Sequence, residues 1–145
     1  MFIGEYRHTV DEKSRISLPA KFKKELGKKV VVTRGLDNCL FLFTHKAWLQ
    51  MSEETAKLGH MQMDSRGFNR FLFAGAVEID VDSMGRILIP DYLRTFAKLN
   101  EKNVVFAGVH SRIEIWSDKL WDAYKKKIEK EADSMAEKLS AIGLR

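Results

Sequence analysis

A ten-residue segment occurs twice in this chain, and it constrains the fold more than any other feature of the sequence. Residues 10–19 and 81–90 share the pattern Val-Asp-x-x-x-Arg-Ile-x-[Leu/Ile]-Pro, with five identities in ten positions at an offset of 71. The chain has two prolines, and each ends one copy. Agreement at a fixed spacing indicates an internal duplication, so we expect both copies of the segment to have the same role.

The residues around the first copy predict a β-hairpin followed by a short helix. Apolar and polar residues alternate over residues 4–10 and again over 15–18, which is the pattern of two strands joined by a turn at residues 11–14. Pro19 ends the second strand and suits the first turn of a helix, and Gly27 suits the end of that helix. The second copy predicts the same arrangement, with its hairpin tip at residues 82–85.

The duplication continues beyond the motif. After the short helix, two strand-like runs flank a glycine turn, and a hydroxyl side chain then precedes another helix. The matching residues are Gly35 with Gly108, Thr44 with Ser117 and Trp48 with Trp121, all at an offset of 73.

A repeat unit of this kind, roughly 45 residues long, is too small to bury a sufficient core alone. We therefore expect a mixed α/β fold in which the two halves interleave their hairpins about a pseudo-two-fold axis and share one β-barrel-like core. The C-terminal helix has an apolar stripe that suits core or subunit packing. The expected segments are a first half (1–50), a helical connector (51–75), a second half (76–121), and a C-terminal helix and tail (122–145).

Composition points to a cytosolic protein with no membrane segment. No run approaches the 18 apolar residues of a spanning helix, and the single Cys39 suits a reducing compartment. The formal net charge is +5, and the first 48 residues carry twice as many basic as acidic side chains. Such charge permits a polyanionic partner, although a solvated helix face explains it equally well.

The sequence offers no pattern typical of an enzyme. The four histidines are scattered without metal-ligand spacing, and neither a phosphate-binding glycine loop nor a nucleophile elbow is present. We expect no catalytic residue, no metal and no cofactor.

The two hairpin tips carry the polar pattern that most needs an explanation. Asp11 precedes Arg15 by four residues, and Asp82 precedes Arg86 in the same way. One interpretation is that each pair only holds its turn together. The other is that the aspartate orients an arginine whose planar donors reach phosphate or a guanine edge. Lys13 adds charge to the first tip, so the two tips are not expected to contribute equally.

These motifs resemble a known class of DNA-binding proteins. The Val-Asp-x-x-x-Arg-Ile-x-Leu-Pro segment with its following helix is similar to the swapped-hairpin element of the AbrB/SpoVT class. The duplicated form, with the N-terminal sequence Met-Phe-Ile-Gly-Glu-Tyr, resembles the MraZ family of bacterial transcriptional regulators over essentially the whole chain. Ser14 departs from the glycine that is usual at this place in AbrB-like tips.

The resemblance implies a sequence-specific regulator that binds double-stranded DNA. Its targets would be short direct repeats upstream of the cell division and cell wall gene cluster, which includes its own gene. It also implies self-association into a closed, octamer-like ring and a cytoplasmic, nucleoid-associated protein. The expected DNA contacts are Lys13, Arg15 and Arg86, with Arg7, Lys21 and Lys23 as further phosphate contacts and Asp11 and Asp82 as orienting residues.

One alternative function remains open from the sequence. AbrB-type folds also serve as antitoxin-like or other protein-interaction modules, and here such a role would lie in the C-terminal helix, residues 117–139. A module of that kind is expected to carry a long acidic or disordered partner-binding tail, which this sequence does not show before it stops at residue 145.

Overall fold

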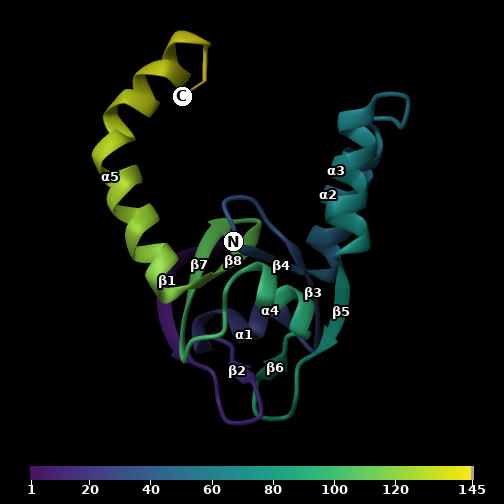
Figure 1. The fold of residues 1–145 in the computed structure, drawn as a ribbon, viewed down its shortest axis with the longest axis vertical. Coiled ribbons are helices and arrows are strands. Elements are labelled where there is room, and N and C mark those ends of the chain that lie inside the picture. The colour runs from purple at the N-terminus through teal and green to yellow at the C-terminus, as the bar shows by residue number, and fades with distance from the viewer. Residues whose placement is uncertain (145) are drawn as a thin grey trace.

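A computed structural model describes residues 1–144, so Arg145, the last residue of the expected tail, lies outside the described residues. In residues 1–144 the chain forms eight strands and five helices (Figure 1). In chain order they are β1 (Phe2–Thr9), β2 (Arg15–Ser17), α1 (Ala20–Leu26), β3 (Lys29–Arg34), β4 (Leu40–Thr44), α2 (His45–Ala56), α3 (Met63–Ala74), β5 (Val77–Asp80), β6 (Arg86–Leu88), α4 (Asp91–Phe96), β7 (Asn103–His110), β8 (Arg112–Ser117) and α5 (Asp118–Ala141).

The strands form two antiparallel sheets. Six of them make one sheet in the order β1-β7-β8-β4-β3-β5, and β2 pairs with β6 in a second, two-stranded sheet. Within residues 1–144 the hydrogen bonding leaves β1 and β5 as edges of the larger sheet. The expected β-barrel is therefore an open sheet with a small second sheet, because no strand pairing joins β1 to β5.

The two halves of the chain are interleaved in both sheets, because within residues 1–144 four strand pairs join one half to the other and only β3–β4 and β7–β8 stay within a half. β1 of the first half pairs with β7 of the second, and β5 of the second half pairs with β3 of the first. In the two-stranded sheet Ile16 lies opposite Ile87, which is its own counterpart at an offset of 71. At the centre of the larger sheet Phe41 lies opposite Glu114, its counterpart at an offset of 73. Both registers are those of a pseudo-two-fold axis.

The predicted local hairpins are only partly correct. β1 and the segment after the first turn share a single bridge, Val10 with Ile16, before the two strands separate and take partners from the other half. The proposed match of Gly35 with Gly108 is wrong by one residue. Val30 pairs with Thr44 and Val104 with Ser117, so β3 and β7 differ by 74 positions and Gly108 corresponds to Arg34.

The shared core explains why the halves need each other. Its buried side chains come from both copies of the duplicated unit and are mostly branched aliphatic residues that suit strands. Burying one such side chain contributes roughly 1.5–3 kcal/mol, so a core drawn from both halves supplies what one half lacks. The fully buried members include Ile16, Leu18, Val30, Leu40, Leu42, Ile87, Ile89, Leu93, Val104, Phe106, Ile113 and Ile115.

Helices α1, α2, α4 and α5 begin where the sequence predicts them. Pro19 and Pro90 precede α1 and α4, and Gly27 ends α1 with a φ of 75°. The hydroxyl of Thr44 accepts a hydrogen bond from the Ala47 N–H at 3.0 Å, which caps α2. Ser117 caps α5 in the same way, accepting from the Leu120 N–H at 3.1 Å. Each cap satisfies a backbone donor that the helix itself leaves unpaired.

The long helices extend away from the body of the molecule. α2 and α3 rise together on one side and α5 rises on the other, while β2 and β6 lie at the opposite end (Figure 1). The first turns of α5 pack against the sheet, where Tyr124 stacks on Trp116 with ring centroids 5.1 Å apart. Farther along, Met135 and Leu139 are exposed, so no other part of residues 1–144 covers the distal half of the predicted apolar stripe.

Candidate nucleic-acid interface

The turn after β1, residues 11–15, is organised by one carboxylate and is called the first tip below. The Asp11 Oδ1 accepts hydrogen bonds from the backbone N–H groups of Lys13 and Arg15, both at 2.9 Å. The Asp11 Oδ2 accepts from the Nε of Arg15 at 2.8 Å. The Ser14 N–H closes the turn on the Asp11 carbonyl at 3.0 Å. One side chain therefore fixes both the backbone of the tip and the arginine at its end.

The turn after β5, residues 82–86, has the same construction and is called the second tip. The Asp82 Oδ1 accepts from the N–H groups of Met84 and Arg86 at 2.9 and 2.8 Å, and its Oδ2 accepts from the Arg86 Nε at 2.8 Å. Gly85 has a φ of 75° and Ser14, its counterpart, a φ of 64°. The departure from glycine therefore leaves the conformation of the first tip unchanged, although serine adopts this region less readily.

Each tip arginine is held by one edge and leaves the other open. The ion pair to the aspartate uses Nε, and within residues 1–144 neither Nη atom of Arg15 or Arg86 has a hydrogen-bond partner. The Arg15 side chain is 32% exposed and that of Arg86 is 23% exposed. A guanidinium fixed in this way presents a planar pair of donors suited to phosphate or a guanine edge without first losing rotamer freedom.

The same hydrogen bonds keep the tip aspartates ionised. The pKa of the Asp11 carboxyl lies below its usual range, chiefly because the Arg15 backbone N–H donates to it and further because the Arg15 side chain does so. The pKa of Asp82 is lowered by the corresponding bonds from Arg86. Both aspartates therefore keep their charge, and their hold on the arginines, at neutral pH.

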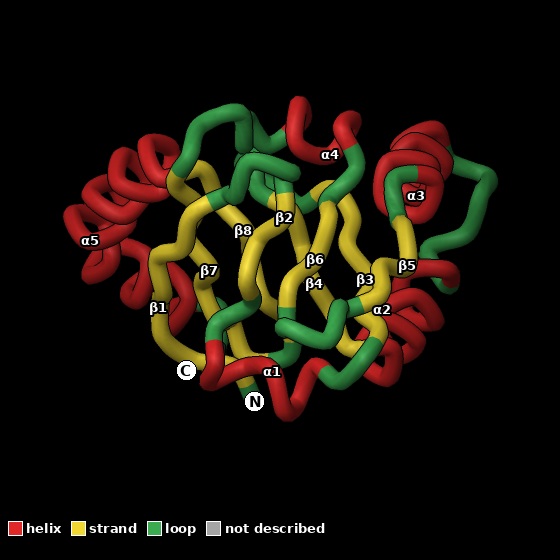
Figure 2. Tube along the Cα trace, turned by 90° about the horizontal axis from the view of Figure 1, so that it is seen from below, coloured by secondary structure: helices red, strands yellow, loops and turns green. Residues whose placement is uncertain are grey.

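Both tips lie at one end of the molecule, away from the helical arms. Figure 1 places the loops beside β2 and β6 together at the end opposite α5 and the α2–α3 pair. Viewed from that end, β2 and β6 run side by side and α1 and α4 flank them from opposite sides (Figure 2). Lys21 is exposed on α1, and the Lys23 side chain lies against Gly85 of the second tip. Lys13, Arg15 and Arg86 thus lie at this end of the molecule together with Lys23, and Lys21 is exposed on the same helix as Lys23.

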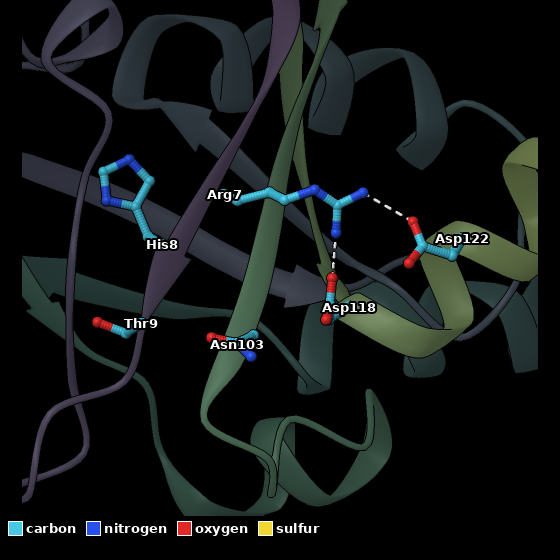
Figure 3. A pocket seen from close by; sticks show the side chains of 6 residues that line it. All are labelled: Arg7, His8, Thr9, Asn103, Asp118 and Asp122. Carbon is cyan, nitrogen blue, oxygen red and sulfur yellow. Dashed lines mark hydrogen bonds and ion pairs between the residues drawn. The ribbon is translucent and has the colours of Figure 1, made fainter.

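Arg7 lies elsewhere. Its guanidinium forms ion pairs with Asp118 and Asp122 in the first turns of α5, the latter at 2.7 Å (Figure 3). Together with His8 and Asn103 these residues line an open pocket of about 320 Å³. The pKa of Arg7 is raised by the hydrogen bond to Asp122. These ion pairs balance the charge of Arg7 and link β1 to the first turns of α5.

Sequence reasoning missed Arg94, a basic residue beside the first tip. Arg94 on α4 shares a cavity of about 440 Å³ with Asp11 and Ser14 of the first tip. Arg94 is the counterpart of Lys23 at an offset of 71, so extending the repeat alignment into the short helices reveals it. It also pairs with Asp91 in its own helix, a partner that Lys23 lacks because Ala20 stands at the equivalent place.

A metal site and a reactive thiol are the other kinds of site to consider. Within residues 1–144 no three His, Cys, Asp or Glu side chains gather closely enough to hold a metal ion. Cys39 is fully buried, its thiol lies 3.1 Å from the Leu36 carbonyl oxygen, and burial raises its pKa well above the usual range. A thiol that stays protonated is a poor nucleophile. Among the described helices, none is both long and apolar enough to cross a membrane.

Comparison with known proteins identifies the family. The model of the family described as "MraZ protein, putative antitoxin-like" matches the chain twice, over residues 1–71 and 72–143. A protein of Caldanaerobacter subterraneus subsp. tengcongensis is 48% identical over 99% of this chain and its own whole length. Proteins of Moorella thermoacetica and Carboxydothermus hydrogenoformans are 45% and 47% identical over 96% of both chains.

All three relatives carry the name "Transcriptional regulator MraZ", which describes a regulator rather than an enzyme. The two matched repeats span the duplicated units that the strand pairing interleaves. With two family repeats, near-complete coverage by relatives above 40% identity and a duplicated Asp-x-x-x-Arg tip, this chain belongs to the MraZ family.

Proposed function

We propose that this protein is a sequence-specific DNA-binding transcriptional regulator. Its targets are short direct repeats in the promoter of the cell division and cell wall gene cluster, including the protein's own gene. The names of its relatives support the regulatory role. The clustered tips support DNA as the partner, because an arginine with two free, fixed donors suits both phosphate and guanine.

The observation that carries this proposal is the identical construction of the two tips. Asp11 and Asp82 each hold the Nε edge of an arginine, and within residues 1–144 its Nη atoms have no hydrogen-bond partner. The two tips lie at one end of the molecule (Figure 1). A pair used only to stabilise its turn gains nothing from unpaired outer donors. Repeating the arrangement across a pseudo-two-fold axis gives one subunit two DNA-binding points on the same face.

The proposed contacts divide into two kinds. Arg15 and Arg86 bind base edges or phosphates through their outer donors, and Lys13 supports the first tip. Lys21 and Lys23 bind the DNA backbone from α1. Arg7 is left out of this interface because its charge is already balanced by α5.

Several subunits acting together would strengthen this contact. We propose that the protein works as a closed, octamer-like ring at the nucleoid in the cytoplasm. Direct repeats would then meet several tips in one assembly, and affinity would rise through effective concentration rather than through any single tight contact.

A binding titration with the intergenic duplex upstream of the gene tests the proposal. Arg15→Ala and Arg86→Ala should each weaken binding by about 1–3 kcal/mol while the circular dichroism spectrum stays native. The charge-matched control is Lys46→Ala with Lys57→Ala, an exposed residue of α2 and the exposed residue that follows its last turn. α2 rises away from the end that carries the tips (Figure 1). Unchanged affinity in the Arg15→Ala/Arg86→Ala double variant, or equal loss in the control, contradicts the assignment.

The second candidate is a protein-interaction or antitoxin-like module acting through α5. Its support is the exposure of Met135 and Leu139 on that helix, together with the words "antitoxin-like" in the family description. Removing residues 132–145 keeps the packed first half of α5 and separates the candidates. Loss of a protein partner with DNA binding intact favours the module. DNA binding that falls only in step with oligomer size favours the regulator.

A further inference from the structure

We propose that each DNA-binding head combines the tip of one half with the short helix of the other half. In particular, Lys23 of α1 belongs functionally to the second tip and not to the first tip, which lies nearer in sequence. This inference rests on the proposed function, because it assigns the partner of Lys23 within a DNA-binding surface.

The contact between Lys23 and Gly85 is the most direct observation for this pairing. A Cβ placed on Gly85 would lie 2.5 Å from the Lys23 Cε and 2.7 Å from its Nζ, so the lysine stem passes directly over the second tip. Gly85 also has a φ of 75°. Glycine at this place therefore serves two purposes, since it permits the turn and leaves room for a side chain from the other half.

A backbone contact fixes the same partnership. The Leu18 N–H, one residue before Pro19 and α1, donates to the Gly85 carbonyl at 2.9 Å. This bond ties the segment that leads into the Lys23 helix to the second tip. Within residues 1–144 the counterpart from Ile89 to Ser14 is not formed, so the two heads are not equally coupled.

The first tip is completed from the opposite direction. Arg94 of α4, the counterpart of Lys23, lines the cavity beside Asp11 and Ser14. Figure 2 shows α1 and α4 on opposite flanks of the β2–β6 pair, as this exchange requires. Arg94 is already paired with Asp91. Lys23 has no ion-pair partner within residues 1–144, so its full charge is available to a ligand.

The contact of Lys23 with the second tip changes which of the two tips carries more basic charge. By sequence the first tip has Lys13 and the second has Met84 at the same place, which makes the first tip look stronger. In the folded chain Lys23 supplies the second tip with the ammonium group that Met84 lacks. An ammonium on a flexible stem beside an oriented guanidinium suits one DNA backbone phosphate held by both groups.

A double-mutant cycle measured by fluorescence anisotropy tests the pairing, with the upstream intergenic duplex as the probe. Lys23→Met keeps the aliphatic stem over Gly85 and removes the charge. It should weaken binding about threefold to tenfold and lower the slope of log affinity against log salt by about 1. Lys24→Met, its exposed neighbour on α1, is the matched control and should leave affinity within about twofold.

The cycle distinguishes the possible partners of Lys23. In the Arg86→Ala background the effect of Lys23→Met should shrink below about twofold, whereas in the Arg15→Ala background it should persist. The inference is overturned if Lys23→Met has its full effect in the Arg86→Ala background, or if its effect disappears only with Arg15→Ala.

The outcomes also separate this inference from the proposed function. If neither Arg15→Ala nor Arg86→Ala weakens binding, DNA binding through the tips is wrong and this inference is overturned with it. If the arginine variants weaken binding but Lys23 acts independently of Arg86, only the exchange between halves is wrong. Coupling of Lys23 with Arg86 alone supports both.

Discussion

At the scale of single residues, one aspartate at each tip does two jobs. Its Oδ1 receives two backbone N–H groups and its Oδ2 receives the arginine Nε, so the turn and the side chain cannot be fixed separately. The sequence could predict the Asp–Arg pair, because four residues across a turn bring the groups within reach. It could not predict which edge of the guanidinium is used, since that depends on the closed backbone of the tip.

The tip aspartates predict a defined pH dependence of stability. Their pKa is lower in the folded than in the unfolded chain, so their contribution is fully present above the unfolded pKa of about 4 and is lost as pH falls through the folded pKa. Asp11→Asn/Asp82→Asn should therefore be less stable than wild type at pH 7, and the difference should shrink below about pH 4.

Urea unfolding across pH 2.5–7 measures this difference. Asp133→Asn, at an exposed position on α5, serves as the control and should follow wild type. A difference between wild type and the double variant that grows toward acid pH would contradict the assignment of these carboxylates as charged hydrogen-bond acceptors.

Ser14 carries a small backbone strain that glycine would relieve. Its φ of 64° is a conformation that costs a non-glycine residue roughly 1 kcal/mol. Ser14→Gly should therefore raise the free energy of unfolding by up to about 0.5 kcal/mol after the greater flexibility of unfolded glycine is allowed for. Ser83→Gly is the matched control in the second tip, where φ is not positive, and should lower stability. Loss of stability in Ser14→Gly would show that the serine side chain contributes more than its strain costs.

At the scale of elements, strand partners were the hardest feature to predict. Alternating apolar residues locate β1 and β5, and the prolines and hydroxyl caps locate the helices. The pattern says which face of a strand is buried, but it is satisfied equally by a partner from either half. The exchange of β1 to β7 and β5 to β3 follows only from the pseudo-two-fold packing of both halves.

The attachment of α5 to β1 gives a prediction about Arg7. Arg7→Ala removes the ion pairs to Asp118 and Asp122, and because these groups are partly exposed the cost should be no more than about 1 kcal/mol. The loss should be local, with faster amide exchange in the first turns of α5 and DNA affinity within about twofold of wild type. If DNA affinity falls as far in Arg7→Ala as it does in Arg15→Ala, Arg7 contacts DNA and its exclusion from the interface is wrong.

At the scale of the whole molecule, duplication joins two halves, each too small to bury its own core, into one domain. The two ends of this domain carry different elements. One end carries both tips, and the other carries α5 and the α2–α3 pair as separate arms (Figure 1). The tips derive their common direction from the β2–β6 pairing, in which Ile16 meets Ile87 on the pseudo-two-fold axis. This geometry allows one end to bind DNA while the arms remain free for contacts between proteins.

The central claim is that the end with the two tips binds DNA and the arms do not. Hydrogen exchange with mass spectrometry, with and without the upstream duplex, tests this claim most directly. DNA should protect residues 11–15 and 82–86 together, since both tips face one ligand, and should leave the distal half of α5 unchanged at constant oligomer size. Protection confined to α5 or to the α2–α3 arm, with exchange at both tips unaltered by DNA, would contradict the account.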